Sequence, residues 1–145
     1  MVIDSSALVA ILLDEPEAEY LMTALAADPL RCISAFSVLE TSVVLYRRKG
    51  GDAVAELDAL LADLGIEIVP FDAAQVRAAR LAHQRFGKGL HPASLNLGDC
   101  CSYALAHTRN QQLLYKGDDF PRTDLPAVAG VPPPKPAQDG TETPD

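Results

Sequence analysis

The chain has 145 residues, of which 48% are hydrophobic, 22% charged and 6% aromatic, and its formal net charge is −8. A chain of this length buries enough surface in one domain to fold without disulfides or a structural metal. It has no basic leader followed by an apolar run, and no apolar stretch reaches the ~20 residues of a membrane span. Its three cysteines lack disulfide-framework and zinc-site spacing, so we expect a cytoplasmic protein with reduced, buried thiols.

Strand-like and helix-like segments alternate along the chain. In chain order the patterns predict a strand over 1–3, helices over 5–13 and 17–27, a strand over 31–34, helices over 36–48 and 53–64, and a strand over 66–71. A helix capped by Asp72 then runs to about Phe86, and a helix over 98–108 and a strand over 113–115 follow. Strands separated by helices need crossover connections, which favour a parallel sheet. The sequence therefore predicts an α/β fold, a parallel-stranded sheet flanked by helices on both faces.

The last 15 residues differ in composition from the rest. Residues 131–145 read VPPPKPAQDGTETPD and contain five prolines, with Val131 as their one large apolar residue. Such a segment cannot form a packed core. We therefore predict one domain over 1–130 and a disordered tail over 131–145.

Several acids follow predicted strands or begin predicted helices. Asp4 follows the first strand, Asp99 begins a helix, and Asp118 and Asp119 follow the last strand. Each has a local explanation, since aspartate caps helices well and acids in turns are commonly just solvated. In parallel α/β folds, however, ligands bind beyond the carboxyl ends of the strands. These acids are therefore candidates for one shared site.

Glu40 stands out because of its neighbours on the predicted helix. Phe36, Leu39, Val43 and Tyr46 form an apolar stripe at helical spacing, and Glu40 falls inside it. A glutamate that faces a core is costly unless it is paired, protonated or bound to a cation. A salt bridge and a metal site both remain open at this point.

Converging carboxylates without bases repel one another and raise their own pKa values. A divalent cation relieves that repulsion, and ligation by oxygen alone favours Mg²⁺ or Mn²⁺ over zinc. Mg²⁺ held by a few carboxylates and water commonly serves phosphodiester hydrolysis. The acids together therefore predict a metal-dependent nuclease.

Four segments in this order carry a family resemblance across roughly residues 1–128: MVIDSSALVAIL, SVLET, LGDCCSYALA and LLYKGDDFPRTD. With them the chain resembles the PIN-domain ribonucleases of the VapC type, the toxins of bacterial toxin–antitoxin pairs. The resemblance implies a PIN-like three-layer sandwich and a Mg²⁺-dependent endoribonuclease that cuts RNA. It also implies inhibition by a cognate VapB-like antitoxin, and family members are commonly homodimers.

The resemblance assigns roles to individual residues. Asp4 and Asp99 look like the main metal ligands. Glu40 looks like the third acid, which binds metal or orients water. Ser6 occupies the position of a small hydroxyl residue beside the first aspartate.

The fourth acid is ambiguous in the sequence. Family members often show KGNDF where this chain has KGDDF, so either Asp118 or Asp119 fills the position. Asp119 is favoured because it directly precedes Phe120.

Basic residues gather in one part of an otherwise acidic chain. Residues 1–72 hold 13 acids and 4 bases, whereas residues 73–130 hold 4 acids and 7 bases. Since RNA backbones attract cations, we expect some of a group in this stretch to contact phosphates. The group is Arg77, Arg80, Arg85 and Lys88.

Three other readings compete with the nuclease. A haloacid-dehalogenase phosphatase needs a second aspartate two residues after Asp4, where this chain has Ser6. A phospho-accepting receiver domain would use Lys116 after the last strand, but its paired acids after the first strand are missing. A catalytically idle homologue would bind Mg²⁺ or partners without cutting RNA.

Overall fold

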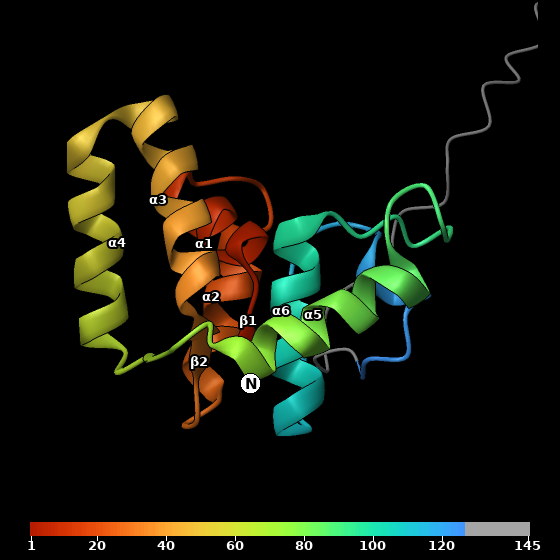
Figure 1. Cartoon of the computed structure of the whole chain (residues 1–145). Helices are drawn as coiled ribbons and strands as arrows, with labels where there is room; N and C mark the ends of the chain where they lie inside the picture. Colours follow the sequence, from red (N-terminus) through yellow and green to blue (C-terminus); the bar gives the residue numbers. More distant parts are fainter. Residues whose placement is uncertain (127–145) are drawn as a thin grey trace, which may run out of the picture.

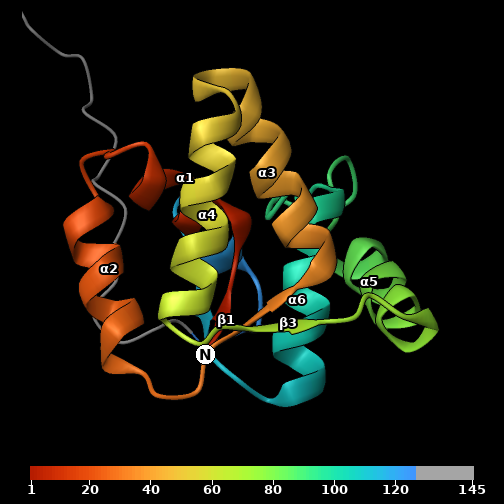
Figure 2. The same ribbon diagram turned by 90° about the vertical axis from the view of Figure 1, so that its left-hand side faces the viewer.

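Four short strands lie side by side in one parallel sheet in the computed structural model, which describes residues 1–126 (Figures 1 and 2). The strands are β1 (Val2–Ile3), β2 (Cys32–Ser34), β3 (Glu67–Val69) and β4 (Leu113–Leu114). Their order across the sheet is β3-β2-β1-β4, and every neighbouring pair is parallel. The predicted α/β class and parallel sheet are confirmed. The predicted boundary at 130 and the tail over 131–145 lie outside the described residues.

Helices cover both faces of this sheet, as the two views show (Figures 1 and 2). On one face Val2 and Leu113 pack into a core with α5 and α6. On the other face Ile3 and Leu114 pack into a second core with α1 to α4. The helices are α1 (Ser5–Leu12), α2 (Ala18–Ala27), α3 (Ala35–Lys49), α4 (Gly51–Asp63), α5 (Ala73–Phe86) and α6 (Leu97–Arg109), and a 3-10 turn, η1, covers Phe120–Arg122.

Local sequence signals place the helix ends. The side chain of Asp72 accepts from the backbone of Gln75 and begins α5, as predicted. Gly50 adopts φ 79°, a conformation that glycine takes without strain, and it both ends α3 and precedes α4. The two helices therefore form the antiparallel hairpin seen at the left of Figure 1.

Three predicted helix starts were late: α3 begins one residue earlier than predicted, α4 two residues earlier and α6 one residue earlier. The sequence placed the start of the last long helix at Gly98, but α6 begins at Leu97 and is capped by Asn96. The difference is small, but it places Asp99 at the third position of the helix, where its side chain forms a capping box with Asn96.

No helix among residues 1–126 is long and apolar enough to cross a membrane. The three cysteines, Cys32, Cys100 and Cys101, are free and buried, as expected. Burial raises the pKa of the Cys100 thiol to about 11 and that of Cys101 to about 12, so both remain protonated thiols at neutral pH.

Candidate active site

Asp4 lies directly after β1 and is only 1% exposed. Its Oδ2 accepts hydrogen bonds from the backbone N–H of Ser6 at 3.0 Å and from the Ser6 hydroxyl at 2.6 Å. Its Oδ1 accepts from the hydroxyl of Ser102, on α6, at 2.5 Å. These donors replace the water that the buried carboxylate has lost. Asp4 therefore caps α1, as the local reading held, and at the same time faces α6.

Asp99 forms a capping box with Asn96 at the start of α6. The backbone N–H of Asn96 donates to Asp99 Oδ2 at 3.0 Å, and the N–H of Asp99 donates to Asn96 Oδ1 at 2.9 Å. Burial, with the negative charges of Asp4, Asp119 and Glu40 added to it, raises the pKa of Asp99 to about 7 despite the Asn96 hydrogen bond. The free Asp99 carboxyl is thus only partly ionised at neutral pH.

Glu40 reaches the same place from α3. Its Oε1 accepts from the hydroxyl of Ser5 at 2.5 Å. Burial raises the pKa of Glu40, and the charge of Asp4 raises it further, whereas the Ser5 hydrogen bond opposes both. The structure therefore brings Asp4, Glu40 and Asp99 together from three different elements.

The predicted core-facing side of the helix that carries Glu40 was wrong. Leu39 is 62% exposed and Tyr46 is 65% exposed, so the apolar stripe on α3 does not face the core. The buried face of α3 is instead formed by Ser37, Thr41 and Leu45. Glu40 lies at the edge of this face, three residues after Ser37. The salt bridge left open for it is not found among the ion pairs of residues 1–126.

Gly98 allows Glu40 to lie against the start of α6. A Cβ placed on Gly98 would come within 2.6 Å of the Glu40 carboxyl carbon and closer still to both carboxyl oxygens. Gly98 itself is buried. The missing side chain is therefore what allows α3 and α6 to bring Glu40 beside Asp99.

We expect Gly98→Ala to displace the Glu40 carboxylate while leaving the fold in place. The obstructing atoms are the mobile end of a long side chain, which can rotate away, and alanine suits a helix better than glycine by about 1 kcal/mol. Catalysis at this site should fall at least about tenfold, with no decrease in the melting temperature. Gly51→Ala, whose added Cβ meets nothing within 4 Å, is the matched control and should leave cleavage unchanged. Full activity of the Gly98 variant would show that the position of Glu40 is not important.

The two candidates for the fourth acid differ in their surroundings. Both Asp118 and Asp119 are exposed in the loop after β4. The charge of Asp119 acts on Asp99, whereas that of Asp118 acts on Tyr115. The loop is tied to Asp4 through Ser6, whose hydroxyl accepts from the backbone N–H of Lys116 at 3.0 Å.

The Lys116 side chain turns away from the acids. Its ammonium group pairs with Glu15 and, at 3.1 Å, with Glu17, in the connection between α1 and α2. It does not take the position that a receiver domain would require beside the acid cluster.

These acids fit a hydrated divalent cation. No ion pair within the described part of the chain includes Asp4, Glu40, Asp99 or Asp119, so their charges lack a basic partner there. Nor do any three acidic, histidine or cysteine side chains in residues 1–126 form a ready three-ligand cage. Mg²⁺ needs none, because it keeps several waters and uses one or two carboxylates. The oxygen-only donors and the uncompensated charge match a divalent cation of this hydrated kind.

The basic candidates occupy different surroundings on α5 and the loop after it. Arg77 and Lys88 are exposed. The Arg85 guanidinium donates to Asp124 at 2.9 Å and to the Tyr103 hydroxyl at 3.3 Å. Arg85 therefore ties the segment after η1 to α5 and α6, and much of its charge is already compensated.

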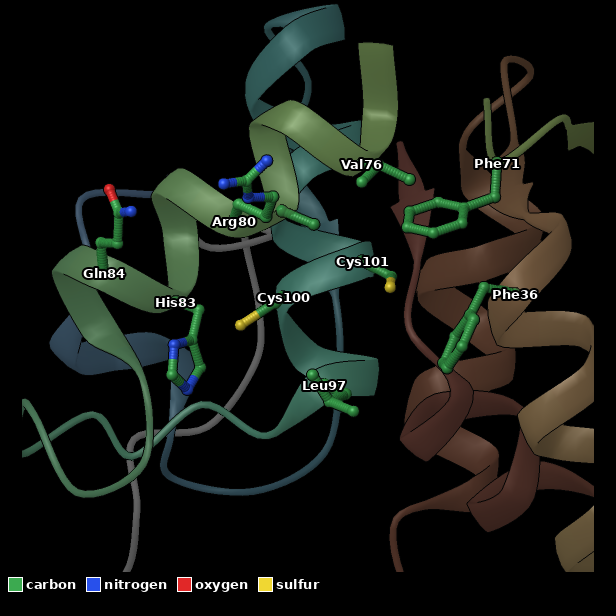
Figure 3. Close-up of a pocket in the computed structure, with 10 residues that line it drawn as sticks. Phe36, Phe71, Val76, Arg80, His83, Gln84, Leu97, Cys100 and Cys101 are labelled. Atoms are coloured by element: carbon green, nitrogen blue, oxygen red, sulfur yellow. The ribbon is translucent and has the colours of Figure 1, made fainter. Parts of the chain in front are cut away.

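An apolar groove of about 480 Å³, which sequence reasoning missed, lies between α3, α5 and α6. Figure 3 shows Phe36 and Phe71 on one side of it, and α5 with Val76 and Arg80 on another. Phe36 stands one helical turn before Glu40, and Leu97, 74% exposed at the other wall, stands two residues before Asp99. The groove thus adjoins the acids. Only contacts between distant elements create it, so no local pattern could have revealed it.

Comparison with known proteins identifies relatives across the described residues. The model of the PIN domain family matches residues 1–125. Ribonuclease VapC of Mycolicibacterium smegmatis is 54% identical over 128 residues, which cover 88% of this chain and 99% of that protein. Ribonuclease VapC30 of Mycobacterium tuberculosis is 49% identical over 129 residues, which cover 89% and 98%.

Solved structures show the same fold. The crystal structure of Mycobacterium tuberculosis VapC20, a sarcin–ricin loop cleaving toxin, matches with a TM-score of 0.74 at 18% identity, over 88% of this chain and 97% of that one. A chain of a toxin–antitoxin complex from Klebsiella pneumoniae matches with a TM-score of 0.59 at 17% identity, over 77% and 82%.

Proposed function

Because the chain belongs to the VapC ribonucleases of the PIN-domain family, we propose that it is the toxin of a toxin–antitoxin pair and hydrolyses RNA phosphodiester bonds at the Asp4, Glu40 and Asp99 cluster. The observation that carries the proposal is the meeting of Asp4, Glu40 and Asp99 from three elements, with no basic partner among residues 1–126. Burial and the neighbouring carboxylates accordingly raise the pKa of Asp99 to about 7. A bound cation stabilises such a site, because it relieves the repulsion between the carboxylates. The sequence reading of a metal-dependent nuclease agrees with this geometry.

The residues divide the work by their positions. Asp4 and Asp99 would hold the metal, which is Mg²⁺ or its substitute Mn²⁺. Glu40 would bind the same ion or orient a water molecule. When bound, the ion lowers the pKa of a coordinated water and stabilises charge on the phosphate. Ser6 fixes Asp4 through two hydrogen bonds to Oδ2. The Ser5 hydroxyl directs Glu40.

Asp119 is our proposed fourth acid, because its charge raises the pKa of Asp99. The charge of Asp118 instead raises the pKa of Tyr115. Its exposure leaves it free to face water and substrate at the rim of the cluster. Asp118 would then be a solvated loop residue.

Purified, metal-stripped protein incubated with structured RNAs tests the proposal. Cleavage should need added Mg²⁺ or Mn²⁺ and should stop with EDTA. Incubation with acetyl phosphate, followed by mass spectrometry, distinguishes a receiver domain from a nuclease. A receiver would gain the mass of a phosphoryl group, whereas a nuclease would not. Absence of cleavage with either ion, across several structured RNAs, would favour the catalytically idle homologue.

RNA contact is expected at Arg80 and Lys88 more than at Arg85. Arg80 lines the groove beside the acids and Lys88 is exposed, whereas Arg85 is paired with Asp124. Replacing Arg80 and Lys88 by alanine should lower RNA affinity and reduce the slope of log affinity against log salt by about 1 per lost phosphate contact. Arg77 is exposed on the same helix and is the next candidate.

Titration calorimetry with RNA at two salt concentrations measures this effect. Arg85→Ala, which removes one positive charge elsewhere, is the control and should change the salt slope less. An unchanged affinity and slope in the double variant would place the RNA elsewhere on the surface.

We further propose that a cognate VapB-like antitoxin inhibits the enzyme by laying an apolar segment in the groove beside Phe36 and Leu97. The groove is apolar and the adjoining cluster is acidic, so a segment that ends in an Arg or Lys would complement both. The toxin–antitoxin complex among the similar structures supports such a partner. Co-expression with the product of a neighbouring small reading frame, followed by copurification, tests it.

Two further properties belong to the proposal. We propose a homodimer, supported by the exposed apolar stripe of Leu39, Val43 and Tyr46 on α3, which association would cover. Light scattering after gel filtration would give the mass directly.

The reduced cysteines and the RNA substrate support a cytoplasmic location.

A further inference from the structure

Two buried serines lie beneath the acid cluster. Ser102, on α6, donates its hydroxyl hydrogen to Asp4 Oδ1 at 2.5 Å. Ser37, on α3, has its hydroxyl oxygen 3.2 Å from that of Ser102. Both residues are completely buried. The two hydroxyls and the carboxylate therefore form one chain of hydrogen bonds from α3 through α6 to the end of β1.

The direction of this chain follows from the number of hydrogens. A carboxylate only accepts, and the single hydroxyl hydrogen of Ser102 is directed to Asp4. The Ser102 oxygen must therefore accept from Ser37, which supplies its own hydrogen. Ser37 in this way holds the Ser102 hydroxyl in the rotamer that serves Asp4.

The two serines also stand at fixed places relative to the other acids. Ser37 lies three residues before Glu40 on α3, and Ser102 lies three residues after Asp99 on α6. Residues three apart on a helix share a face. The hydroxyl chain thus joins the three elements that carry Asp4, Glu40 and Asp99, one turn below the acids themselves.

A buried hydroxyl in a helix has to be explained by what it contacts. Alanine would be the better helix former, and burying a hydroxyl without a partner costs free energy. At Ser102 the partner is a carboxylate, which makes the hydrogen bond stronger than one between neutral groups. The bond also fixes the second oxygen of Asp4, whose first oxygen is held by Ser6.

We propose that Ser102, oriented by Ser37, is a positioning residue that sets the Asp4 carboxylate for metal binding. The inference rests on the proposed metal site. Ser102 is fully buried and would act only through Asp4, to which it donates. Without it, the Asp4 carboxylate keeps its bonds to Ser6 but gains freedom to rotate about them. Loss of a group that orients a metal ligand typically weakens metal affinity by about 10- to 100-fold.

Mn²⁺ binding to metal-stripped protein, followed by calorimetry and by the electron paramagnetic resonance of the free ion, tests the inference without relying on cleavage. Ser102→Ala should weaken Mn²⁺ binding at least about tenfold. It should also lower the melting temperature, because it leaves Asp4 Oδ1 and the buried Ser37 hydroxyl without their partner. Thr41→Val is the matched control, because Thr41 is a fully buried hydroxyl on the same face of α3 that donates only to the Ser37 carbonyl. It should lower stability but leave Mn²⁺ affinity at the wild-type value.

Other results separate the possible failures. Wild-type affinity in Ser102→Ala, with Asp4→Asn still unable to bind Mn²⁺, would overturn the positioning role and leave the metal site standing. A wild-type protein that binds no Mn²⁺ would overturn both. If Ser102→Ala does not fold, Ser102→Cys keeps the bulk of the side chain with a weak donor, and the same tenfold loss is expected of it.

Discussion

Asp4→Asn is expected to reduce RNA cleavage by roughly a thousandfold or more, because it removes the negative charge from the one fully buried acid of the cluster. The size of the side chain is kept, so the effect should be chemical and not structural. Cleavage of a structured RNA at saturating Mg²⁺ gives the rate, and circular dichroism with a thermal melt reports the fold.

The hydrogen bonds around Asp4 can adapt to the amide. The amide oxygen can still accept from the Ser6 backbone, and the new NH₂ can face Ser102. Ser102 then accepts from the amide and turns its hydrogen toward Ser37, which reverses the hydroxyl chain. We therefore expect a folded protein with a melting temperature near that of the wild type.

Asp14→Asn is the charge-matched control for this variant. Asp14 follows the other end of α1 and adopts φ 52°, which asparagine tolerates. It should cleave RNA at the wild-type rate. Undiminished cleavage by Asp4→Asn would remove Asp4 from the mechanism and, with it, the proposed site.

The stability of the metal-free protein is expected to fall as the pH rises from about 4 to about 7. Burial and the neighbouring acids raise the Asp99 pKa to about 7 in the fold, against an ordinary value of 3.8 in the unfolded chain. Between these values the folded state binds more protons than the unfolded state, so the free energy of unfolding decreases with pH. The contribution of Asp99 is fully present below pH 3.8 and is lost as the pH passes 7. Because the carboxylate is partly exposed to water, the change is smaller than the roughly 4 kcal/mol that full burial would give.

Urea denaturation of metal-stripped protein at pH 5 and pH 8 measures this change. Asp99→Asn cannot ionise, but its side-chain oxygen can still accept from Asn96, so it should be more stable than the wild type at pH 8 and lose much of the pH dependence. Glu40, whose pKa is also raised, contributes in the same direction and accounts for a remainder. Saturating Mg²⁺ should stabilise the wild type more at pH 8 than at pH 6, since the ion competes with the proton for the carboxylate. Parallel pH curves for wild type and variant would contradict the raised pKa.

Local chemistry in the sequence was enough to predict the elements and the side of the sheet where the acids meet. Alternating segments predicted a parallel sheet, and parallel strands end at one edge, so Asp4 after β1 and the loop after β4 had to lie near each other. Helix caps such as Asp72 act within a few residues of the chain, which is why their positions could be read directly.

Contacts between distant residues decided the rest. The apolar stripe on α3 predicted the wrong buried face. The buried face of α3 carries Ser37 and Thr41, and its Ser37 hydroxyl bonds to Ser102, which in turn donates to Asp4. Glu40 lies beside Asp99 because Gly98 on α6 has no side chain. The sequence of α3 alone contains no information about this contact.

The difference between Asp118 and Asp119, the pairing of Arg85 with Asp124, and the groove beside Phe36 likewise depend on where separate elements meet. Periodicity reports which residues of one element share a face. It carries no information about the partner that each face meets, and that partner sets burial, charge compensation and hydrogen bonding. The sequence by itself thus determined the elements and the edge of the sheet where the acids lie, and only the tertiary structure determined how these acids are buried, paired and oriented.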